Sequence, residues 1–503
     1  MAAGQRGEPR KMKLMEELFP FEIPNWISGE QRLAISEEWM DKLNPHNGEV
    51  LCRVARSRAE DVDAAVESAK AAQPSWAQLP PVRRGEILRE IAEGLKKNRD
   101  QIARIVAAET GKSHKDALGE TDGAAALGFF YAGEGQRLYG RTTTSGVANR
   151  AAMTVRAPIG VAGLIIAANT PIANVAWKVF PALICGNSAV LKAAEDTPAT
   201  AWIFGRIAAE CGLPEGVLQV VQGYGREAGE ALVANADVGV LSFTGSTAVG
   251  RRIAVTAGER LAKVSLELGG KNPLIVCDDA DLENAAKWVL LSAFSNAGQR
   301  CAAGSRIIVF DAVYEQFREM LVARTQQLKI GPNDGDDLGP VINERGLSRM
   351  VEAVAAAHKG GAKVLVGGAR LDGDAHRNGF YMAPTLVETE NLHDDFSTTE
   401  LFGPVAGLHR ARDFADAMQQ ANDSPYGLTA CIHTRSLHRA LEFTHNVRAG
   451  MAVVNAGTFG SEPHMPFGGA GLSGNGSREP GTEALDIYSD LKAVYYNCDP
   501  AQT

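Results

Sequence analysis

Short apolar runs and amphipathic stretches alternate along the first half of the chain, and few folds accommodate that alternation. Val161–Ala168 is an apolar run of strand length, and Ala176–Cys185 follows it with the spacing of a helix that ends before Gly186. Further strands are predicted, with helical segments between them, over Ser188–Leu191, Val217–Val221, Val238–Ser242 and Val264–Leu268. The alternation predicts a parallel sheet with helices on both of its faces.

Local signals mark where some of these helices begin and end. Thr197 precedes Pro198, the favoured residue at the first helical position, and Gly212 stands where that helix should end. Ser57 and Glu60 have the spacing of a capping box ahead of another helix.

The same alternation resumes after residue 270. Pro273–Cys277 and Ser305–Phe310 are predicted strands on either side of a helix over Asp281–Ser292, and the glycine-rich stretch Gly367–Gly379 is predicted to be a loop between strands. A chain of 503 residues is also longer than one simple core usually organises. We therefore expect a second α/β domain.

Composition argues against several classes of function. The net charge is −9, whereas a protein that binds a nucleic-acid backbone needs a basic face. The seven cysteines are scattered and form no C-x-x-C, so neither a disulfide framework nor a zinc site is indicated, and a reduced, cytoplasmic location fits. The ten histidines include no H-E-x-x-H, so we expect no metal. No apolar stretch approaches the ~20 residues of a membrane span, so we expect no membrane contact.

Two segments carry side chains that suit catalysis. Cys301 follows a turn that contains Gly298 and precedes a predicted strand. A lone cysteine is most often a small buried side chain, although this position also suits a nucleophile. Glu267 ends a predicted strand and enters the pair Gly269-Gly270. It is either a surface charge or a carboxylate in a site, and the paired glycines indicate that backbone or ligand approaches closely.

Other segments suit a dinucleotide. Phe243–Gly250 follows a predicted strand and opens a helix, whose free N–H groups and positive dipole end favour a pyrophosphate. Gly223–Gly229 lacks the G-x-G-x-x-G pattern, so the ordinary dinucleotide fingerprint is absent. Lys192 ends a third strand, and Glu195, three residues on, either holds ribose hydroxyls or is a solvated loop charge.

Taken together, these segments resemble the aldehyde dehydrogenase superfamily. They occur in the family's order and at its spacings from about residue 40 to 495. The matching pieces are Ala168–Pro171, Lys192 with Glu195, Phe243–Gly250, Glu267–Pro273, Gly298–Cys301, Glu400–Pro404, Pro466–Gly469, Ser473-Gly474 and Arg478-Glu479.

The resemblance implies an α/β architecture in three parts. A Rossmann-like parallel-sheet domain for NAD would comprise residues 1–140 and 159–266, and an α/β catalytic domain would comprise residues 267–470. A small β element, residues 141–158 and 484–503, would mediate oligomerisation. Members of the family usually form homodimers or homotetramers.

The resemblance also implies the chemistry. Cys301 would attack the aldehyde, and we expect the site, with Arg300 as a contributor, to lower the pKa of its thiol. The Asn169 side-chain amide and the Cys301 backbone N–H would stabilise the oxyanion. After hydride transfer to the nicotinamide, Glu267 would activate the water that hydrolyses the thioester. Glu479 matches a residue thought to relay the proton, or else it pairs with a nearby cation.

NAD is the implied cofactor. We expect weaker use of NADP, because a 2′-phosphate would bring negative charge against Glu195, although Lys192 softens that preference. The resemblance assigns Glu400 and Phe402 to the nicotinamide and its ribose, and Lys192 and Glu195 to the adenosine ribose. The other implied dinucleotide contacts are Ile166, Gly225, Gly229, Phe243, Gly245, Ser246, Val249 and Leu268.

Departures from the family pattern bear on the substrate, a small-molecule aldehyde. Many members have Pro-Trp-Asn where this chain has Ala167-Ala168-Asn169, and Thr170 stands where an aromatic residue is common. Trp177 and Phe467 still match aromatic positions of the substrate tunnel. Arg300 either pairs with a carboxylate of the substrate or turns away and braces a neighbouring acid. We therefore expect a polar or anionic aldehyde. The segment 481–486 is similar to that of semialdehyde dehydrogenases, including those acting on 2-oxoglutarate semialdehyde.

Two alternatives stay open. In a CoA-acylating enzyme, CoA takes the acyl group in place of water, and such chemistry needs no base like Glu267. A non-catalytic binding protein on the same scaffold would need none of Cys301, Glu267 and Asn169. Both alternatives therefore leave part of the pattern unexplained.

Overall fold

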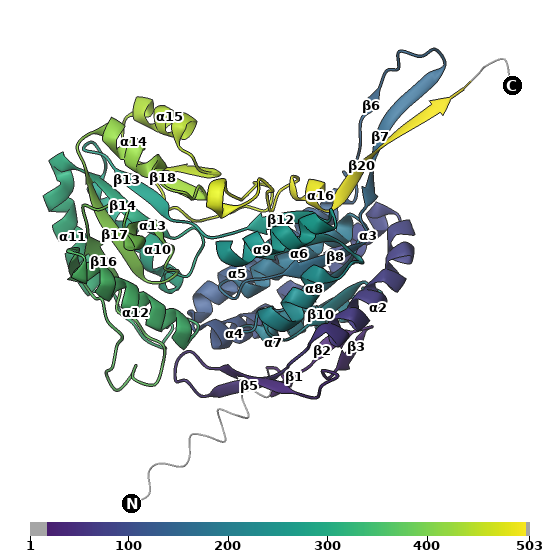
Figure 1. Cartoon of the computed structure of the whole chain (residues 1–503), viewed down its shortest axis with the longest axis horizontal. Helices are drawn as coiled ribbons and strands as arrows, with labels where there is room; N and C mark the ends of the chain where they lie inside the picture. Colours follow the sequence, from purple (N-terminus) through teal and green to yellow (C-terminus); the bar gives the residue numbers. More distant parts are fainter. Residues whose placement is uncertain (1–17, 499–503) are drawn as a thin grey trace, which may run out of the picture.

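A computed structural model of the chain describes residues 18–498 (Figure 1). The first 17 residues of the expected cofactor domain and the last five of the expected oligomerisation element lie outside the described residues. The described part contains two seven-stranded sheets and two three-stranded ones. The expected α/β fold with parallel sheets is confirmed.

The first seven-stranded sheet has the order β12-β11-β8-β9-β10-β2-β3. Its strands from β12 to β10 are all parallel, whereas β2 and β3 add an antiparallel edge that the alternation did not predict. The apolar run that begins at Val161 leaves the strand at Ile165, so Ile166–Ala168 belong to the loop beyond it. The bounds are β2 Asn25–Ile27, β3 Glu30–Arg32, β8 Val161–Ile165, β9 Ser188–Lys192, β10 Leu218–Val221, β11 Val238–Thr244 and β12 Lys263–Glu267.

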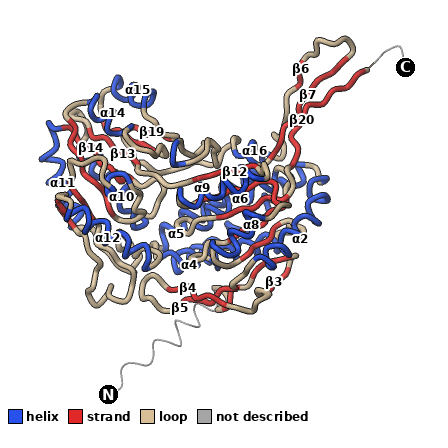
Figure 2. The backbone as a smooth tube through the Cα atoms, in the orientation of Figure 1, coloured by secondary structure: helices blue, strands red, loops and turns tan. Residues whose placement is uncertain are grey.

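Helices cover both faces of this sheet, as predicted (Figure 2). Successive strand residues alternate between two apolar clusters: Leu164 and Leu191 pack on one side, and Val161 and Val190 on the other. The first side is covered by α3 Pro81–Lys97, α4 Arg99–Thr110, α5 His114–Glu134, α6 Pro171–Ile184 and α7 Pro198–Glu210, and the second mainly by α2 Ala59–Gln78, α8 Glu230–Ala234 and α9 Thr247–Glu259.

The capping box predicted from Ser57 and Glu60 is wrong by one residue. The cap is Arg58, whose backbone N–H donates to the Asp61 carboxylate over 3.0 Å. Ser57 instead donates its buried hydroxyl to Asn25 over 2.9 Å. A long-range contact with β2 therefore takes the side chain that the local pattern assigned to the helix.

The second seven-stranded sheet has the order β15-β16-β17-β14-β13-β18-β19 and is parallel except at β15. The predicted loop 367–379 lies between β15 and β16. The strands are β13 Asn272–Val276, β14 Gly304–Phe310, β15 Lys363–Val366, β16 Thr385–Glu388, β17 Val405–Ala411, β18 Thr429–His433 and β19 Met451–Val454. The helices around them are α10 Leu282–Phe294, α11 Tyr314–Gln326, α12 Glu344–Lys359, α13 Asp395–Thr398, α14 Phe414–Asn422 and α15 Leu437–Asn446.

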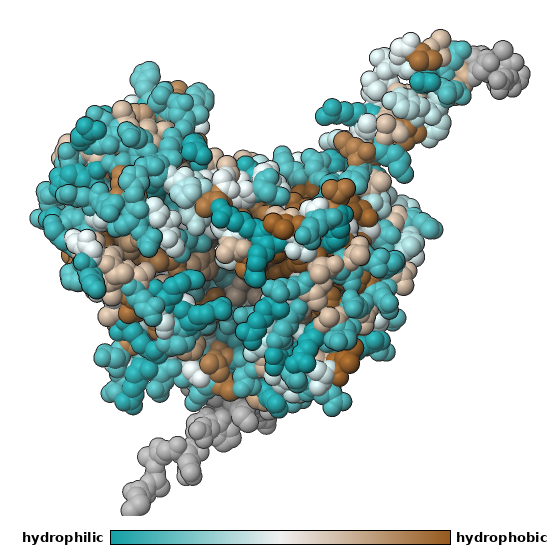
Figure 3. Space-filling view, in the orientation of Figure 1, coloured by the Kyte–Doolittle hydropathy of each residue, from teal (hydrophilic) through white to brown (hydrophobic). Residues whose placement is uncertain are grey.

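A β arm projects from the body of the molecule (Figures 1 and 3). It consists of β6 Thr142–Thr143, β7 Arg150–Pro158 and β20 Ser489–Asn497, which follows the short helix α16 Ala484–Ile487. β20 pairs antiparallel with β7 along its whole length. Leu491, Tyr495 and Tyr496 are exposed on it. The role in assembly expected for this arm stays a prediction.

A small sheet of β1 Glu22–Ile23, β5 Val50–Ala55 and β4 Trp39–Leu43 completes the fold. Within residues 18–498, no helix combines the length and the apolar character needed to cross a membrane.

Candidate active site

The loop that carries Cys301 has an unusual backbone. Helix α10 ends at Phe294, and Asn296, Ala297 and Gly298 then adopt φ values of 54°, 51° and 66°. Two consecutive residues with side chains in the left-handed region cost energy, and such strain persists only where surrounding contacts impose it. A side chain at Gly298 would overlap the Gly403 carbonyl, so only glycine fits there.

Asn272 at the start of β13 anchors this loop. Its side-chain amide donates to the carbonyls of Cys301 over 2.7 Å and Ala303 over 2.9 Å, and its oxygen accepts from the Thr429 backbone N–H. The side chain is buried, so all three contacts hold the loop against the second sheet. Sequence reasoning did not single out Asn272.

Cys301 opens into a cavity of about 390 Å³ that also receives Asn169 and Glu267. The three residues come from separate segments: Asn169 lies between β8 and α6, and Glu267 ends β12. The cavity brings together three of the four predicted catalytic residues. Its lining is Ala167, Asn169, Thr170, Asn174, Trp177, Thr244, Gly245, Ser246, Thr247, Ala248, Glu267, Leu268, Gly269, Cys301, Arg349, Glu400, Phe402, Tyr426 and Phe467.

Glu267 is a buried carboxylate without a partner. Neither of its oxygens has a hydrogen bond to the described part of the chain. Burial raises the pKa of Glu267 well above its usual value; Glu479 adds to this shift, and Lys178 and Arg478 oppose it. The group is therefore suited to take up a proton inside the cavity.

The glycine pair after Glu267 admits two neighbours, as its sequence indicated. A methyl group on Gly269 would overlap the Glu400 carboxylate, and one on Gly270 would lie 2.8 Å from the Cys301 carbonyl oxygen. The Gly270 backbone N–H also donates to Glu400 over 3.1 Å. The pair therefore lets a carboxylate and the loop of the cysteine approach the same turn.

The expectation that the site lowers the pKa of Cys301 is wrong for the protein without a bound partner. Burial, together with the nearby carboxylates of Glu400 and Glu267, raises the pKa of this thiol to about 12. Arg300 does not offset them, because its guanidinium lies over the Phe459 ring, 4.5 Å from the centroid. The resting group is a thiol.

Asn169 points its functional group into the cavity. Its side-chain amide makes no hydrogen bond with residues 18–498, while its backbone carbonyl accepts from Lys112 and Asn296. Trp177 and Phe467 line the cavity as an edge-to-face pair with centroids 5.3 Å apart. Thr170 also lines it.

Arg300 does not line this cavity with them. Its guanidinium forms no ion pair within the part of the chain that the structure describes, and its Nε is buried without a hydrogen-bond partner. Phe459 packs in the same cluster as Trp177, Cys301 and Phe467. The guanidinium thus lies next to the aromatic side chains that line the cavity, without lining the cavity itself.

Glu479 lies behind the cavity wall rather than in it. Its carboxylate is completely buried and accepts from Lys178 over 2.8 Å, from Ser242 over 2.7 Å and from Tyr488 over 3.0 Å. Lys178 is therefore the nearby cation that the sequence offered as an alternative partner for Glu479. The available signal for it was that Lys178 is the one charged residue of the largely apolar helix α6.

A second cavity, of about 550 Å³, lies against β11 and α9. The predicted contacts Glu195, Gly225, Gly229, Phe243 and Val249 line it, whereas Gly245, Ser246, Leu268, Glu400 and Phe402 line the cavity of Cys301. The Gly225 backbone N–H donates to Glu195 over 3.1 Å. Sequence reasoning missed three arginines in the second cavity, Arg226, Arg252 and Arg345.

Two predicted contacts line neither cavity. Ile166 lies in the apolar core, and its neighbour Ile165 lines the second cavity instead. Lys192 is buried at the end of β9, where burial lowers its pKa to about 8.

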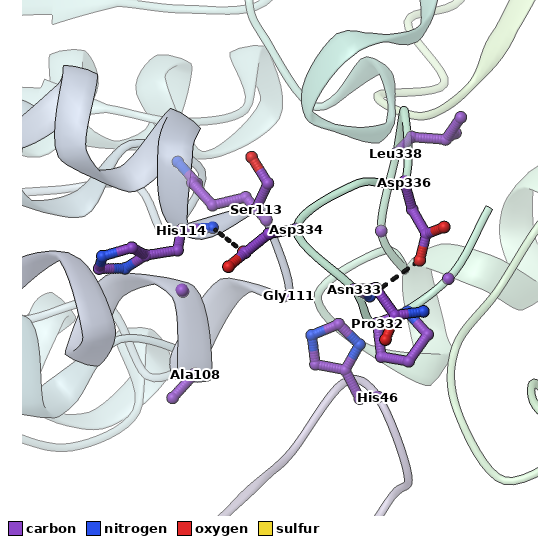
Figure 4. A pocket seen from close by; sticks show the side chains of 14 residues that line it. His46, Ala108, Gly111, Ser113, His114, Pro332, Asn333, Asp334, Asp336 and Leu338 are labelled. Carbon is purple, nitrogen blue, oxygen red and sulfur yellow. Dashed lines mark hydrogen bonds between the residues drawn. The ribbon is translucent and has the colours of Figure 1, made fainter. Parts of the chain in front are cut away.

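A further, smaller cavity of about 160 Å³ lies apart from these two (Figure 4). His46, the turn before α5 and the loop 331–339 surround it, and Asp334 accepts a hydrogen bond from the His114 backbone N–H. None of the predicted site residues lines it.

Comparison with known proteins identifies the scaffold. A sequence profile of the aldehyde dehydrogenase family matches residues 33–494. The chain belongs to the aldehyde dehydrogenase family. It is therefore an enzyme that oxidises an aldehyde, as its sequence indicated.

Among this aldehyde dehydrogenase's relatives is an alpha-ketoglutaric semialdehyde dehydrogenase of Bacillus subtilis, 37% identical over 94% of this chain and 97% of the relative. An NADP⁺-named succinate-semialdehyde dehydrogenase of Escherichia coli is also 37% identical, over 93% of this chain and 96% of the relative. A solved betaine aldehyde dehydrogenase of Staphylococcus aureus, in complex with NAD⁺, is 31% identical with a TM-score of 0.94 and covers 98% of both chains.

Proposed function

We propose that this enzyme oxidises a semialdehyde with a carboxylate at its far end, using NAD⁺ and a thioester on Cys301. The observation that carries the proposal is the shared cavity, in which the Cys301 thiol lies with Asn169 and with Glu267, whose carboxylate has no hydrogen-bond partner within residues 18–498. A nucleophile, an oxyanion donor and a base are the three groups that acyl transfer to water requires.

In the first half-reaction, the Cys301 thiol releases its proton to solvent, its sulfur bonds to the aldehyde carbon, and the carbonyl π electron pair moves to oxygen. The Asn169 amide and the Cys301 backbone N–H donate hydrogen bonds to that oxyanion. Bound NAD⁺ would accept the hydride that leaves this carbon, and its positive ring would favour the thiolate over the thiol.

In the second half-reaction, Glu267 removes a proton from water as the water oxygen bonds to the thioester carbon. The C–S bond breaks, and Cys301 returns as the leaving thiolate. A buried carboxylate with a raised pKa is a stronger base than an exposed one, because the proton it takes up is better held.

The chain's own residues fit NAD⁺ at three points. The start of helix α9 has no side-chain cap at Ser246, so its first N–H groups are free for the pyrophosphate. Glu195 in the second cavity would accept from the adenosine ribose, and Glu400 in the first from the nicotinamide ribose. The solved relative that holds NAD⁺ supports this assignment.

The substrate class rests on Arg300, which does not line the cavity of Cys301 but packs on Phe459 beside Trp177 and Phe467, so a substrate carboxylate would have to reach past these rings. The largely buried Arg300 guanidinium forms no close ion pair with residues 18–498, and the carboxylates of Asp116 and Glu120 act on it only at longer range, so a substrate carboxylate would offset more of the cost of burying this charge. Thr170 leaves the cavity wall more polar than an aromatic side chain would. The two semialdehyde dehydrogenases among the relatives support the same class.

The test compares kcat/KM for a semialdehyde acid and for a neutral aldehyde of equal length, in wild type and Arg300→Met. Loss of a charge-assisted pair of ~1.5–3 kcal/mol should lower kcat/KM for the acid by roughly 10–100-fold, with little change for the neutral aldehyde. Arg410→Met is the matched control, because Arg410 also lies over an aromatic ring, that of Tyr314. Equal losses on both substrates would refute the anionic class, and a requirement for CoA would refute hydrolysis.

A further inference from the structure

Lys112 is a buried lysine that contacts the backbone of Asn169. It lies in the turn between α4 and α5, next to the cavity of Figure 4. Its ammonium donates to the Asn169 carbonyl over 2.7 Å and to the Glu120 carboxylate over 2.5 Å. The two charged side chains are only 3% and 6% exposed. A buried ion pair with this geometry fixes the groups that it joins, since an unpaired charge there would be costly.

Glu120 continues the contact to the helix that follows Asn169. Its second oxygen accepts from the backbone N–H groups of Ile172 over 3.0 Å and Ala173 over 3.3 Å, in the first turn of α6. The cap residue Thr170 makes no side-chain cap hydrogen bond of its own. Glu120 therefore satisfies free N–H groups of α6 from another helix.

We propose that Lys112 and Glu120 form a brace that positions Asn169 for oxyanion stabilisation. The brace holds the chain on both sides of the Asn169 side chain: Lys112 fixes the carbonyl, and Glu120 fixes the turn of α6 immediately after it. Asn296, in the loop of the catalytic cysteine, donates to the same carbonyl over 3.3 Å. The backbone carbonyl of Asn169 is thus tied both to the turn between α4 and α5 and to the nucleophile's loop.

The brace predicts a specific kinetic defect, which rests on the proposed role of Asn169. Removing an oxyanion donor typically costs 10²–10³ in rate, and a misplacement of about 1 Å costs up to about 10². Lys112→Met should therefore slow NADH formation in the first turnover by roughly 10–100-fold. The affinity for NAD⁺ should stay within about twofold, because Lys112 lines neither of the two cavities assigned to NAD⁺.

The experiment is a double-mutant cycle on the first-turnover rate, per folded active site, with Lys112→Met, Asn169→Ala and both together. If the lysine acts through Asn169, Lys112→Met adds less than twofold in the Asn169→Ala background. Equal fold-losses in both backgrounds would overturn the brace. An Asn169→Ala variant with the wild-type rate would instead refute the proposed function.

Arg84→Met is the control for a purely structural effect. Arg84 is also a buried cation, and it donates to the Ile184 carbonyl at the other end of α6. This variant should lower the melting temperature while leaving the first-turnover rate per folded site unchanged. If Lys112→Met does not fold, Glu120→Gln takes its place in the same cycle, because it keeps an acceptor for α6 and removes the charge that pairs with Lys112.

Discussion

Replacing Gly269 with alanine should weaken the binding of NAD⁺ without unfolding the protein. Gly269 does not have a positive φ, so its backbone accepts an alanine. The added methyl group would nevertheless lie 2.7 Å from Glu400 Cδ and overlap the carboxylate oxygen. The cheapest response is a rotation of the half-buried Glu400 side chain, which also breaks its 3.1 Å hydrogen bond to the Gly270 N–H.

The expected size of the effect follows from what Glu400 is proposed to hold. A hydrogen bond to a charged group contributes ~1.5–3 kcal/mol, and 1.4 kcal/mol is a factor of ten in affinity. The dissociation constant for NAD⁺, measured by titration calorimetry, should therefore rise by roughly 10–100-fold. The melting temperature should fall by a few degrees at most.

Gly258→Ala supplies the matched control. Gly258 lies on the exposed side of α9, and a methyl group there would contact nothing. Its affinity for NAD⁺ should match that of wild type. A folded Gly269→Ala protein with unchanged affinity would refute the assignment of Glu400 and of the paired glycines.

Three further predictions follow from charges in the two cavities. Because burial raises the pKa of Glu267, the contribution of this group to stability is fully present below the usual value of 4.5 and is lost as the pH rises through the raised value. Glu267→Gln should therefore have a higher melting temperature than wild type at pH 8 and the same melting temperature at pH 4. Identical melting curves at pH 8 would contradict this. Cys301 should react slowly with iodoacetamide at neutral pH, since its pKa is raised to about 12. Alkylation, followed by peptide mass spectrometry, should be faster when NAD⁺ is bound than when NADH is bound. Equal rates with the two cofactors would contradict the electrostatic argument. Wild type should have a higher kcat/KM with NAD⁺ than with NADP⁺. Glu195→Gln should reduce this ratio, because it removes the repulsion of the 2′-phosphate and leaves Arg345, about 4.0 Å from the Glu195 carboxylate, to attract it. An unchanged ratio would argue against Glu195 as the group that discriminates between the cofactors.

Much of the fold was predictable because its signals are local. Apolar runs of strand length gave β8, β9 and β13 to within about three residues, and Pro198 with Gly212 bracketed α7. The antiparallel edge of β2 and β3 was not predictable in the same way, since those strands are only three residues long. The pairing of β2 with β10 joins segments nearly 200 residues apart, and no local pattern encodes it.

The same distinction between local and long-range signals applies to the residues of the candidate site. Cys301, Glu267 and Asn169 were found because each belongs to a motif of the family, and the cavity contains all three. The contact between Lys112 and Asn169 was missed, and the cation expected as an alternative partner of Glu479 was not identified as Lys178, because each contact joins residues from distant segments. The direction of the pKa shift of Cys301 was also missed.

That error has a physical cause. Sequence proximity placed Arg300 beside the thiol, but consecutive side chains in a turn point in different directions. The structure directs the guanidinium to Phe459, and the charges that shift the pKa of the thiol are the two carboxylates of Glu400 and Glu267. The sign of an electrostatic effect therefore depends on side-chain direction, which residue spacing does not specify.

The most direct test of the proposed chemistry is a rapid-quench experiment on Glu267→Gln with NAD⁺ and a semialdehyde. Because the base is needed to hydrolyse the thioester and not to form it, NADH should appear in a burst of about one per active site, followed by slow turnover. Mass spectrometry of the quenched protein should find the acyl group on the peptide that contains Cys301. If the burst disappears, or if the acyl group never accumulates on that peptide, Glu267 does not act on a Cys301 thioester and the proposed function is wrong.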